Sequence, residues 1–120
     1  MKICTIRELL DAQVICGEDR LGNHVYSACG SDMMSDVLAY VKDQAVLLTG
    51  LVNSQVIRTA EMMDMVCIVF VRSKMPTEEM VQLANDSGIV LLATDKRMYE
   101  ACGLLYSNGL VGNKVKRADA

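Results

Sequence analysis

The chain has 120 residues, the length of one domain, and no stretch rich in Pro, Gly or Ser divides it. Its 15 acidic and 12 basic residues give a net charge of −3, which argues against nucleic acid as the main partner. The apolar content of 52% is high, but runs such as 65–71 are far shorter than the roughly 20 residues that cross a bilayer. No signal or transit segment is recognisable at the N-terminus, so we expect a cytoplasmic protein with neither a membrane nor a nucleic-acid partner.

Two helices and two short strands are predicted in the first 41 residues. Residues 5–8 (Thr-Ile-Arg-Glu) have the pattern of a capping box, which predicts a short helix from about residue 5. Strands are expected at 14–16 and 25–29, and the polar segment 17–24, with the single histidine His24, is typical of a turn. Either Ser31 or Ser35 suits the N-cap of a second helix.

Three blocks of about 22 residues follow, each an apolar run of strand length and then a stretch with helical periodicity. The runs are 45–49, 66–71 and 89–93, and helices are expected to begin near Asn53, near Pro76 and after Asp95. Continuous apolar strands alternating with amphipathic helices predict a parallel sheet covered on both faces. We therefore predict an α/β fold, a three-layer sandwich with a mainly parallel sheet flanked by helices. Residues 1–112 would form the single domain and 113–120 a polar C-terminal tail.

The five cysteines are spaced too irregularly for a zinc motif, and their odd number does not favour a disulfide framework. Cys67 and Cys102 lie in apolar patterns, where a free cysteine packs as a small hydrophobic residue. Cys29, followed by Gly30 and a predicted helix start, is the best candidate for a reactive thiol. No metal and no cofactor is expected.

Ligands of open parallel sheets bind beyond the carboxyl ends of the strands, where the following helices direct free N–H groups. This rule selects the loops at 30–32, 49–53, 72–74 and 94–97, which combine hydroxyl groups, a glycine and basic side chains suited to a phosphate or a carboxylate. The alternative is that Ser31, Asn53 and Asp95 only cap helices and that the basic side chains are solvated. The candidate ligand-binding residues are Ser31, Thr49, Gly50, Asn53, Arg72, Ser73 and Thr94.

The sequence contains neither the dinucleotide fingerprint GxGxxG nor the phosphate loop GxxxxGK[ST], so phosphoryl transfer is not expected. Asp32 and Asp36 are four residues apart, a spacing that suits a cation or an acid and base pair, but acidic residues also favour a helix start. We assign no catalytic residue.

Three segments, 31–38 (SDMMSDVL), 46–50 (VLLTG) and 98–103 (MYEACG), resemble the bacterial DRTGG-domain family, and the similarity covers most of residues 1–110. The chain is more remotely similar to the N-terminal domain of HPr kinase/phosphorylase, which lacks that enzyme's catalytic phosphate loop. The resemblance implies a regulatory or ligand-sensing module. Relatives often have Gly-Asp-Arg in the first of two strand-end loops and Thr-Gly-Gly in the second, where this chain has Leu-Val-Asn (51–53) and Val-Arg-Ser (71–73).

Two classes of function remain open. The first is a non-enzymatic regulatory domain that binds a small anionic metabolite or nucleotide, or a partner protein. The second is a small enzyme acting on a phosphorylated substrate, with Asp32 or Asp95 as acid or base. Nine methionines include the adjacent pairs 33–34 and 62–63, whose members point about 100° apart on a helix and cannot all enter one core. This surplus of apolar surface predicts a homodimer.

Overall fold

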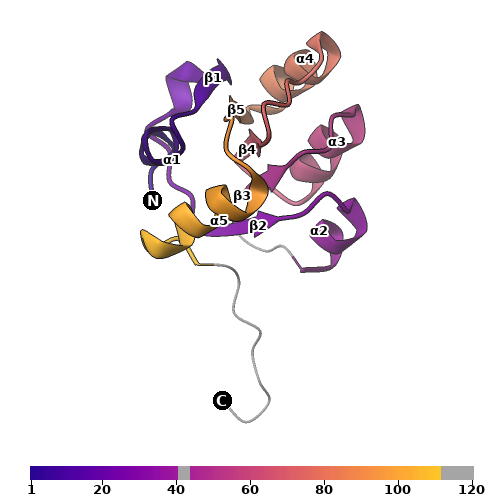
Figure 1. Cartoon of the computed structure of the whole chain (residues 1–120). Coiled ribbons are helices and arrows are strands. Elements are labelled where there is room, and N and C mark those ends of the chain that lie inside the picture. Colours follow the sequence, from indigo (N-terminus) through magenta and orange to yellow (C-terminus); the bar gives the residue numbers. More distant parts are fainter. Residues whose placement is uncertain (41–43, 112–120) are drawn as a thin grey trace.

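The structure, a computed structural model, describes residues 1–40 and 44–111. The elements in chain order are α1 (Ile3–Leu10), β1 (Gln13–Cys16), the 3₁₀ turn η1 (Glu18–Arg20), β2 (Ser27–Gly30), α2 (Met34–Tyr40), β3 (Ala45–Thr49), α3 (Ser54–Met62), β4 (Cys67–Phe70), α4 (Glu78–Ser87), β5 (Val90–Ala93) and α5 (Met98–Ser107). The strands form one sheet in the order β1-β5-β4-β3-β2 (Figure 1). All neighbours are parallel except β1 and β5, so the predicted three-layer α/β fold with a mainly parallel sheet is confirmed.

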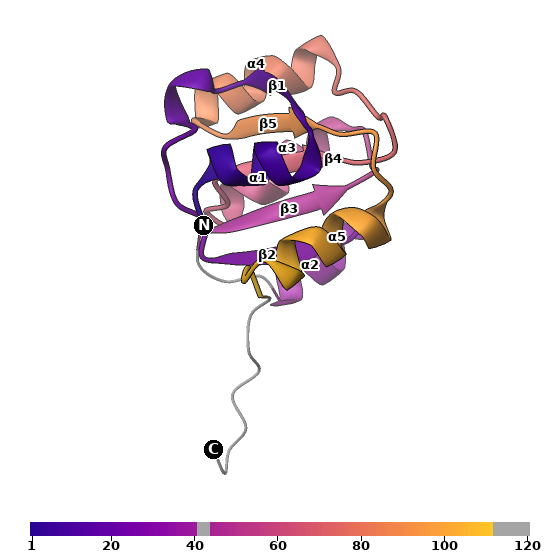
Figure 2. The ribbon, with the colours of Figure 1, turned by 60° about the vertical axis from the view of Figure 1, so that its left-hand side comes forward.

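The helices form two layers, with α2, α3 and α4 on one face of the sheet and α1 and α5 on the other (Figures 1 and 2). From β2 to β5 the chain moves across the sheet in one direction, and right-handed crossovers place the three intervening helices on the same face. After β5 the chain turns to the opposite face to form α5. The connections that follow β4 and β5 therefore leave the carboxyl ends of these strands toward opposite faces of the sheet.

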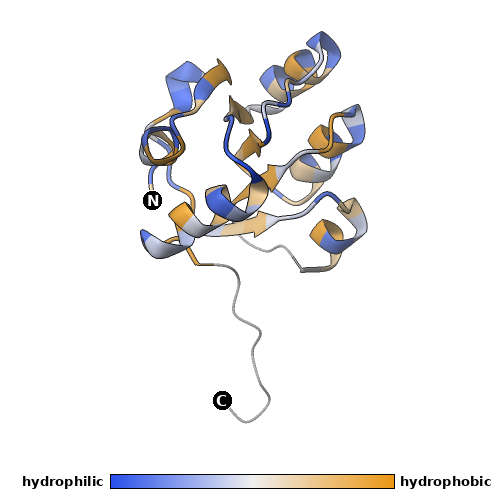
Figure 3. Ribbon diagram, in the orientation of Figure 1, coloured by the Kyte–Doolittle hydropathy of each residue, from blue (hydrophilic) through white to orange (hydrophobic). Residues whose placement is uncertain are grey.

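The strands β3, β4 and β5 are buried along their whole length, which explains their continuous apolar sequences (Figure 3). Along β3, Val46 and Leu48 belong to the core under α1 and α5, whereas Leu47 belongs to the core under α2, α3 and α4. Because successive side chains of a strand point to opposite faces, each central strand contributes to both cores. The described residues contain no helix long and apolar enough to cross a membrane.

Two of the predicted helix boundaries are confirmed by their caps. The side chain of Asn53 accepts a hydrogen bond from the Val56 amide at the start of α3 (3.3 Å). The Thr77 hydroxyl accepts a hydrogen bond from the Met80 amide at the start of α4 (3.2 Å). At its other end, α4 stops at Gly88, which has a left-handed backbone (φ 73°).

The predicted N-caps of three helices were wrong, although all three helices are present. The helix α1 begins at Ile3 and has no side-chain cap, because the carbonyls of Asn23 and Leu21 accept hydrogen bonds from its first amides, at 3.0 and 2.9 Å. The helix α2 begins at Met34, which places Ser35 inside it and Ser31 before it, and Arg97 rather than Asp95 precedes α5. The predicted tail at 113–120 lies outside the described residues.

Candidate functional site

The loops that follow β2, β3, β4 and β5 lie side by side at the carboxyl ends of the strands, which we call the carboxyl edge of the sheet, because these strands are parallel and adjacent. At this edge the chain leaves β4 toward α4 and leaves β5 toward α5 on the opposite face (Figure 2). Open α/β sheets bind ligands at such a divergence, outside the carboxyl ends of the strands. A ligand-binding site is therefore expected at the carboxyl ends of these strands.

Four residues from three of these loops form one polar network, which we call the Asp32 cluster: Asp32, Thr49, Gly50 and Arg72. The carboxylate oxygen Oδ1 of Asp32 accepts hydrogen bonds from the Thr49 hydroxyl (3.0 Å) and from the Gly50 amide (2.7 Å). Its other oxygen lies 3.7 Å from Nη2 of Arg72. Thr49 is buried, but the side chains of Asp32 and Arg72 are about half exposed (49% and 47%), so the network faces solvent.

Gly50 allows the Arg72 side chain to reach this network. A Cβ atom at Gly50 would overlap Nη2 of Arg72 and would lie 2.8 Å from its Cζ and 2.9 Å from its Nε. The guanidinium group thus lies directly against the backbone of Gly50. Any larger residue at this position would push the arginine away from Asp32.

The β4 loop has an unusual backbone, since Arg72 and Ser73 both adopt left-handed conformations with φ of 59°. For residues other than glycine this conformation costs roughly 1–2 kcal/mol each. Two hydrogen bonds to the neighbouring β5 loop hold it: the Arg72 amide donates to the Lys96 carbonyl (2.9 Å) and the Ser73 amide to the Thr94 carbonyl (3.0 Å). The β4 loop therefore keeps, at two residues with side chains, a backbone that glycine favours.

The other predicted site residues form hydrogen bonds outside the Asp32 cluster. Ser73 donates a hydrogen bond to Asp95 (2.8 Å), and the Ser31 hydroxyl accepts one from the Met33 amide (3.0 Å). Asn53 caps α3, as described above. Thr94 is buried, and its hydroxyl donates to the Leu10 carbonyl at the end of α1 (2.7 Å).

The structure therefore brings Thr49, Gly50 and Arg72 together. The side chains of Asn53 and Thr94 instead form hydrogen bonds that stabilise the fold. The sequence places the central acceptor, Asp32, in the first of the four loops and suggests it for a cation site, for an acid and base pair or for a helix start, but not as the acceptor for Thr49 and Gly50. The sequence signal that could have identified it is an aspartate directly after a strand, at the edge where a glycine loop and an arginine loop end. Its partner in the predicted pair, Asp36, lies exposed in the first turn of α2.

Two more basic side chains, Lys74 and Arg97, are exposed in the loops after β4 and β5. Neither forms an ion pair with any residue in the ranges 1–40 and 44–111, whereas Lys96 lies 3.5 Å from Glu100. Unpaired cations in neighbouring loops raise the positive potential of an edge and attract anions.

The surroundings of Cys29, the candidate reactive thiol, do not favour its thiolate form. Burial raises the pKa of the Cys29 thiol, and the neighbouring Cys102 and Asp36 raise it further. Burial also raises the pKa of Cys67, which is fully buried. Since the thiolate is the reactive form, the interpretation of Cys29 as a reactive thiol loses its support. No group of three or more potential metal ligands gathers within the described residues.

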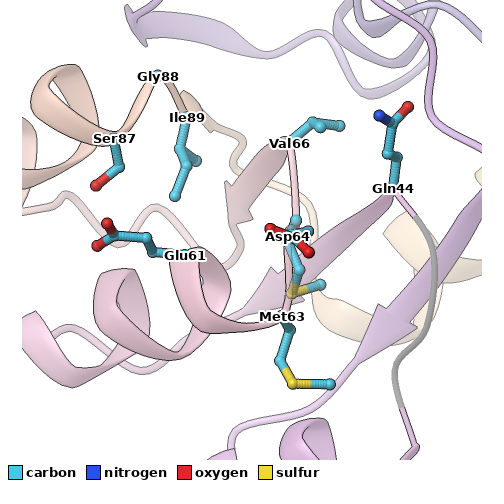
Figure 4. Close-up of a pocket in the computed structure, with 9 residues that line it drawn as sticks. Gln44, Glu61, Met63, Asp64, Val66, Ser87, Gly88 and Ile89 are labelled. Atoms are coloured by element: carbon cyan, nitrogen blue, oxygen red, sulfur yellow. The ribbon is translucent and has the colours of Figure 1, made fainter.

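A hollow of about 640 Å³ lies at the opposite edge of the sheet, where β3, β4 and β5 begin (Figure 4). Glu61 on α3 and Asp64 after it contribute two exposed carboxylates to its wall, together with Gln44, Ser87 and Gly88. Negative charge at its rim disfavours an anionic ligand. Of the two edges, the one that holds the Asp32 cluster is the better suited to an anion.

Comparison with known proteins gives one informative likeness. No family model matches the chain, and no curated protein matches it. A similar solved structure is that of the CBS and DRTGG domains of the regulatory region of Clostridium perfringens pyrophosphatase, complexed with its activator diadenosine tetraphosphate. The TM-score is 0.70 at 15% identity, over 87% of this chain.

This chain spans 45% of that regulatory region, which is less than half of it. At such low identity the likeness concerns the fold alone, and it supports a fold of the kind found in CBS and DRTGG regulatory domains. The likeness does not bear on the more remote resemblance to HPr kinase/phosphorylase.

Proposed function

We propose that this domain is a non-enzymatic sensor that binds a small phosphate-bearing anion, a metabolite or a nucleotide, at the Asp32 cluster. The observation that carries the proposal is the position of Arg72, whose half-exposed guanidinium lies against Gly50 at the carboxyl edge of the sheet. A guanidinium offers five N–H donors in a planar arrangement that matches phosphate oxygens. The Gly50 amide and the Thr49 hydroxyl add two neutral donors beside it.

Charge and fold support the same function. Lys74 and Arg97 are exposed cations in the adjoining loops, and they raise the positive potential of this edge of the sheet. The regulatory region with the similar fold was crystallised with a dinucleotide that carries four phosphates. A sensor for a phosphorylated ligand is consistent with both observations.

The test is a titration of the purified protein with inorganic phosphate, pyrophosphate, ATP and diadenosine tetraphosphate, followed by calorimetry and thermal shift. We expect Arg72→Ala to weaken binding by about 1.5–3 kcal/mol, or about 10- to 150-fold, the contribution of a charged hydrogen bond. Arg58→Ala is the matched control, because it removes the same charge from an exposed position on α3. Absence of binding by the wild-type protein, or equal affinities of the two variants, would overturn the proposal.

The same samples separate a sensor from an enzyme. A small enzyme with Asp32 or Asp95 as acid or base would convert one of these phosphorylated compounds, and a sensor would bind it unchanged. Product analysis by phosphorus NMR after incubation distinguishes the two, since turnover changes the phosphate resonances and binding alone does not.

We also infer that the domain acts as a two-fold dimer. Within the adjacent methionine pair 33–34, Met34 is buried whereas Met33 is 62% exposed. Met62 at the end of α3 is also exposed (71%), and methionine is suited to contact surfaces. Light scattering is expected to give twice the chain mass of 13.2 kDa at micromolar concentration. A mass of 13.2 kDa without concentration dependence would exclude the dimer.

A further inference from the structure

We propose that the carboxylate of Asp32 is a built-in competitor, which occupies the place of the ligand's anionic group and must be displaced when the ligand binds. This inference rests on the proposed function and concerns the regulation of the same site.

The contacts of Asp32 are those of a bound anion. One oxygen accepts hydrogen bonds from the Thr49 hydroxyl (3.0 Å) and the Gly50 amide (2.7 Å), and the other faces Nη2 of Arg72. These are the three donors that the proposed function assigns to a phosphate. A phosphate group and the Asp32 carboxylate therefore cannot use them at the same time.

The elements that hold the donors are more firmly built than the element that holds the carboxylate. Thr49 ends β3, an interior strand of the sheet, and Arg72 follows β4, its central strand. Asp32 follows β2, which is an edge strand, and precedes α2, a helix of seven residues. The backbone that carries the donors is thus anchored in the interior of the sheet, whereas the carboxylate belongs to a segment at its side.

The ion pair between Asp32 and Arg72 is weak in this geometry. The distance of 3.7 Å between Asp32 and Arg72 exceeds the roughly 2.7–2.9 Å of a tight charged hydrogen bond. Both side chains are about half exposed, so water can solvate the carboxylate after a rotation about its Cα–Cβ bond. A phosphate that brings more oxygens and more charge to Arg72 can replace it.

The competition has a clear consequence for affinity. While Asp32 is in place it cancels the charge of Arg72 and uses the two neutral donors, so the wild-type protein binds an anion more weakly than the bare receptor would. Removing the carboxylate should therefore strengthen binding, the opposite of the effect expected for a residue that contacts the ligand.

The experiment measures the dissociation constants of inorganic phosphate and pyrophosphate by calorimetry for the full chain and three variants. Asp32→Ala removes the carboxylate, and Asp32→Asn keeps its shape without its charge, which guards against a loss of folding in the alanine variant. Asp36→Asn is the matched control, because it removes the same charge from an exposed position four residues later. We expect binding at least tenfold tighter for Asp32→Ala, an intermediate gain for Asp32→Asn, and a change below twofold for the control.

Each outcome decides between the two proposals. A gain confined to the Asp32 variants supports the competitor. Unchanged or weaker binding by the Asp32 variants of a ligand that the wild-type protein binds overturns the competitor and leaves the proposed function intact. An equal gain in Asp36→Asn also overturns it, since general charge would be the cause. No binding by any form overturns the competitor and the proposed function together.

Discussion

Replacing Gly50 with alanine should weaken anion binding and leave the stability of the fold almost unchanged. The added methyl group would overlap Nη2 of Arg72 and come within 2.8 Å of its Cζ, so the guanidinium has to move away from Asp32. Gly50 is not among the residues with a left-handed backbone, and its own conformation therefore accepts alanine. The guanidinium is the end of a flexible side chain that is about half exposed, so it can move without disturbing the core.

The magnitudes differ for stability and for binding. Loss of an exposed ion pair costs about 0–1 kcal/mol, and the reduced freedom of the unfolded chain returns about 0.4–1 kcal/mol. The free energy of unfolding should thus change by less than about 1 kcal/mol. Binding of an anion should lose most of the contribution of Arg72, about 1.5–3 kcal/mol, or about 10- to 150-fold in affinity.

Urea denaturation and calorimetry with pyrophosphate measure the two quantities. Gly103→Ala is the matched control, because it adds the same methyl group within α5, where no other atom lies within 4 Å of the new Cβ apart from its own helix backbone and chain neighbours. It should raise stability by about 0.5–1 kcal/mol and leave binding unchanged. If a folded Gly50→Ala protein binds pyrophosphate as tightly as the wild type, the position of Arg72 over Gly50 has no part in binding.

Three further changes test other parts of the structure. Thr94→Val keeps the buried shape but removes the donor to the Leu10 carbonyl, so urea denaturation should show a loss of about 1–3 kcal/mol with anion affinity unchanged; a weaker affinity would instead make Thr94 a ligand contact. Ser73→Gly and Ser73→Ala both remove the hydrogen bond to Asp95, but only glycine relieves the left-handed backbone (φ 59°), so the glycine variant should be the more stable of the two by about 1 kcal/mol in the same assay, and equal stabilities would argue against strain in the β4 loop. Burial raises the pKa of Cys67 above its ordinary 9.0, so the unfolded chain ionises first and stability falls above that pH by about 1.4 kcal/mol per unit. Cys67→Ala should flatten this fall between pH 9 and about 10.5, and parallel stability curves would contradict the assignment.

The central strands could be predicted from sequence because their apolar runs reflect burial on both faces. The run 45–49 coincides with β3, and 66–71 and 89–93 enclose β4 and β5. The caps Asn53 and Thr77 are also local signals, each within three residues of the amide that it accepts. Where the information is local, the sequence is sufficient.

The errors arise where distant segments decide the local structure. The helix α1 needs no capping box because the backbone carbonyls of Leu21 and Asn23 take over its first amides. The antiparallel pairing of β1 with β5 joins segments more than 70 residues apart, and the four residues of β1 contain no pattern that predicts it.

The same limit applies to the site. The rule for parallel sheets selected the loops that hold the Asp32 cluster, but it could not show that the Asp32 carboxylate meets Gly50 and Arg72, which lie 18 and 40 residues farther along the chain. It also could not show that the Thr94 hydroxyl turns inward to Leu10. Side-chain directions in loops depend on packing that only the folded chain defines.

The most direct measurement of the central claim is an NMR titration of the isotopically labelled wild-type protein with pyrophosphate. We expect the amide resonances of Gly50, Leu51, Arg72 and Ser73 to shift together and saturate, because these residues belong to the Asp32 cluster or adjoin it. Shifts concentrated instead at Asp64 and Gly88, in the hollow at the opposite edge, or no shifts at all, would contradict it.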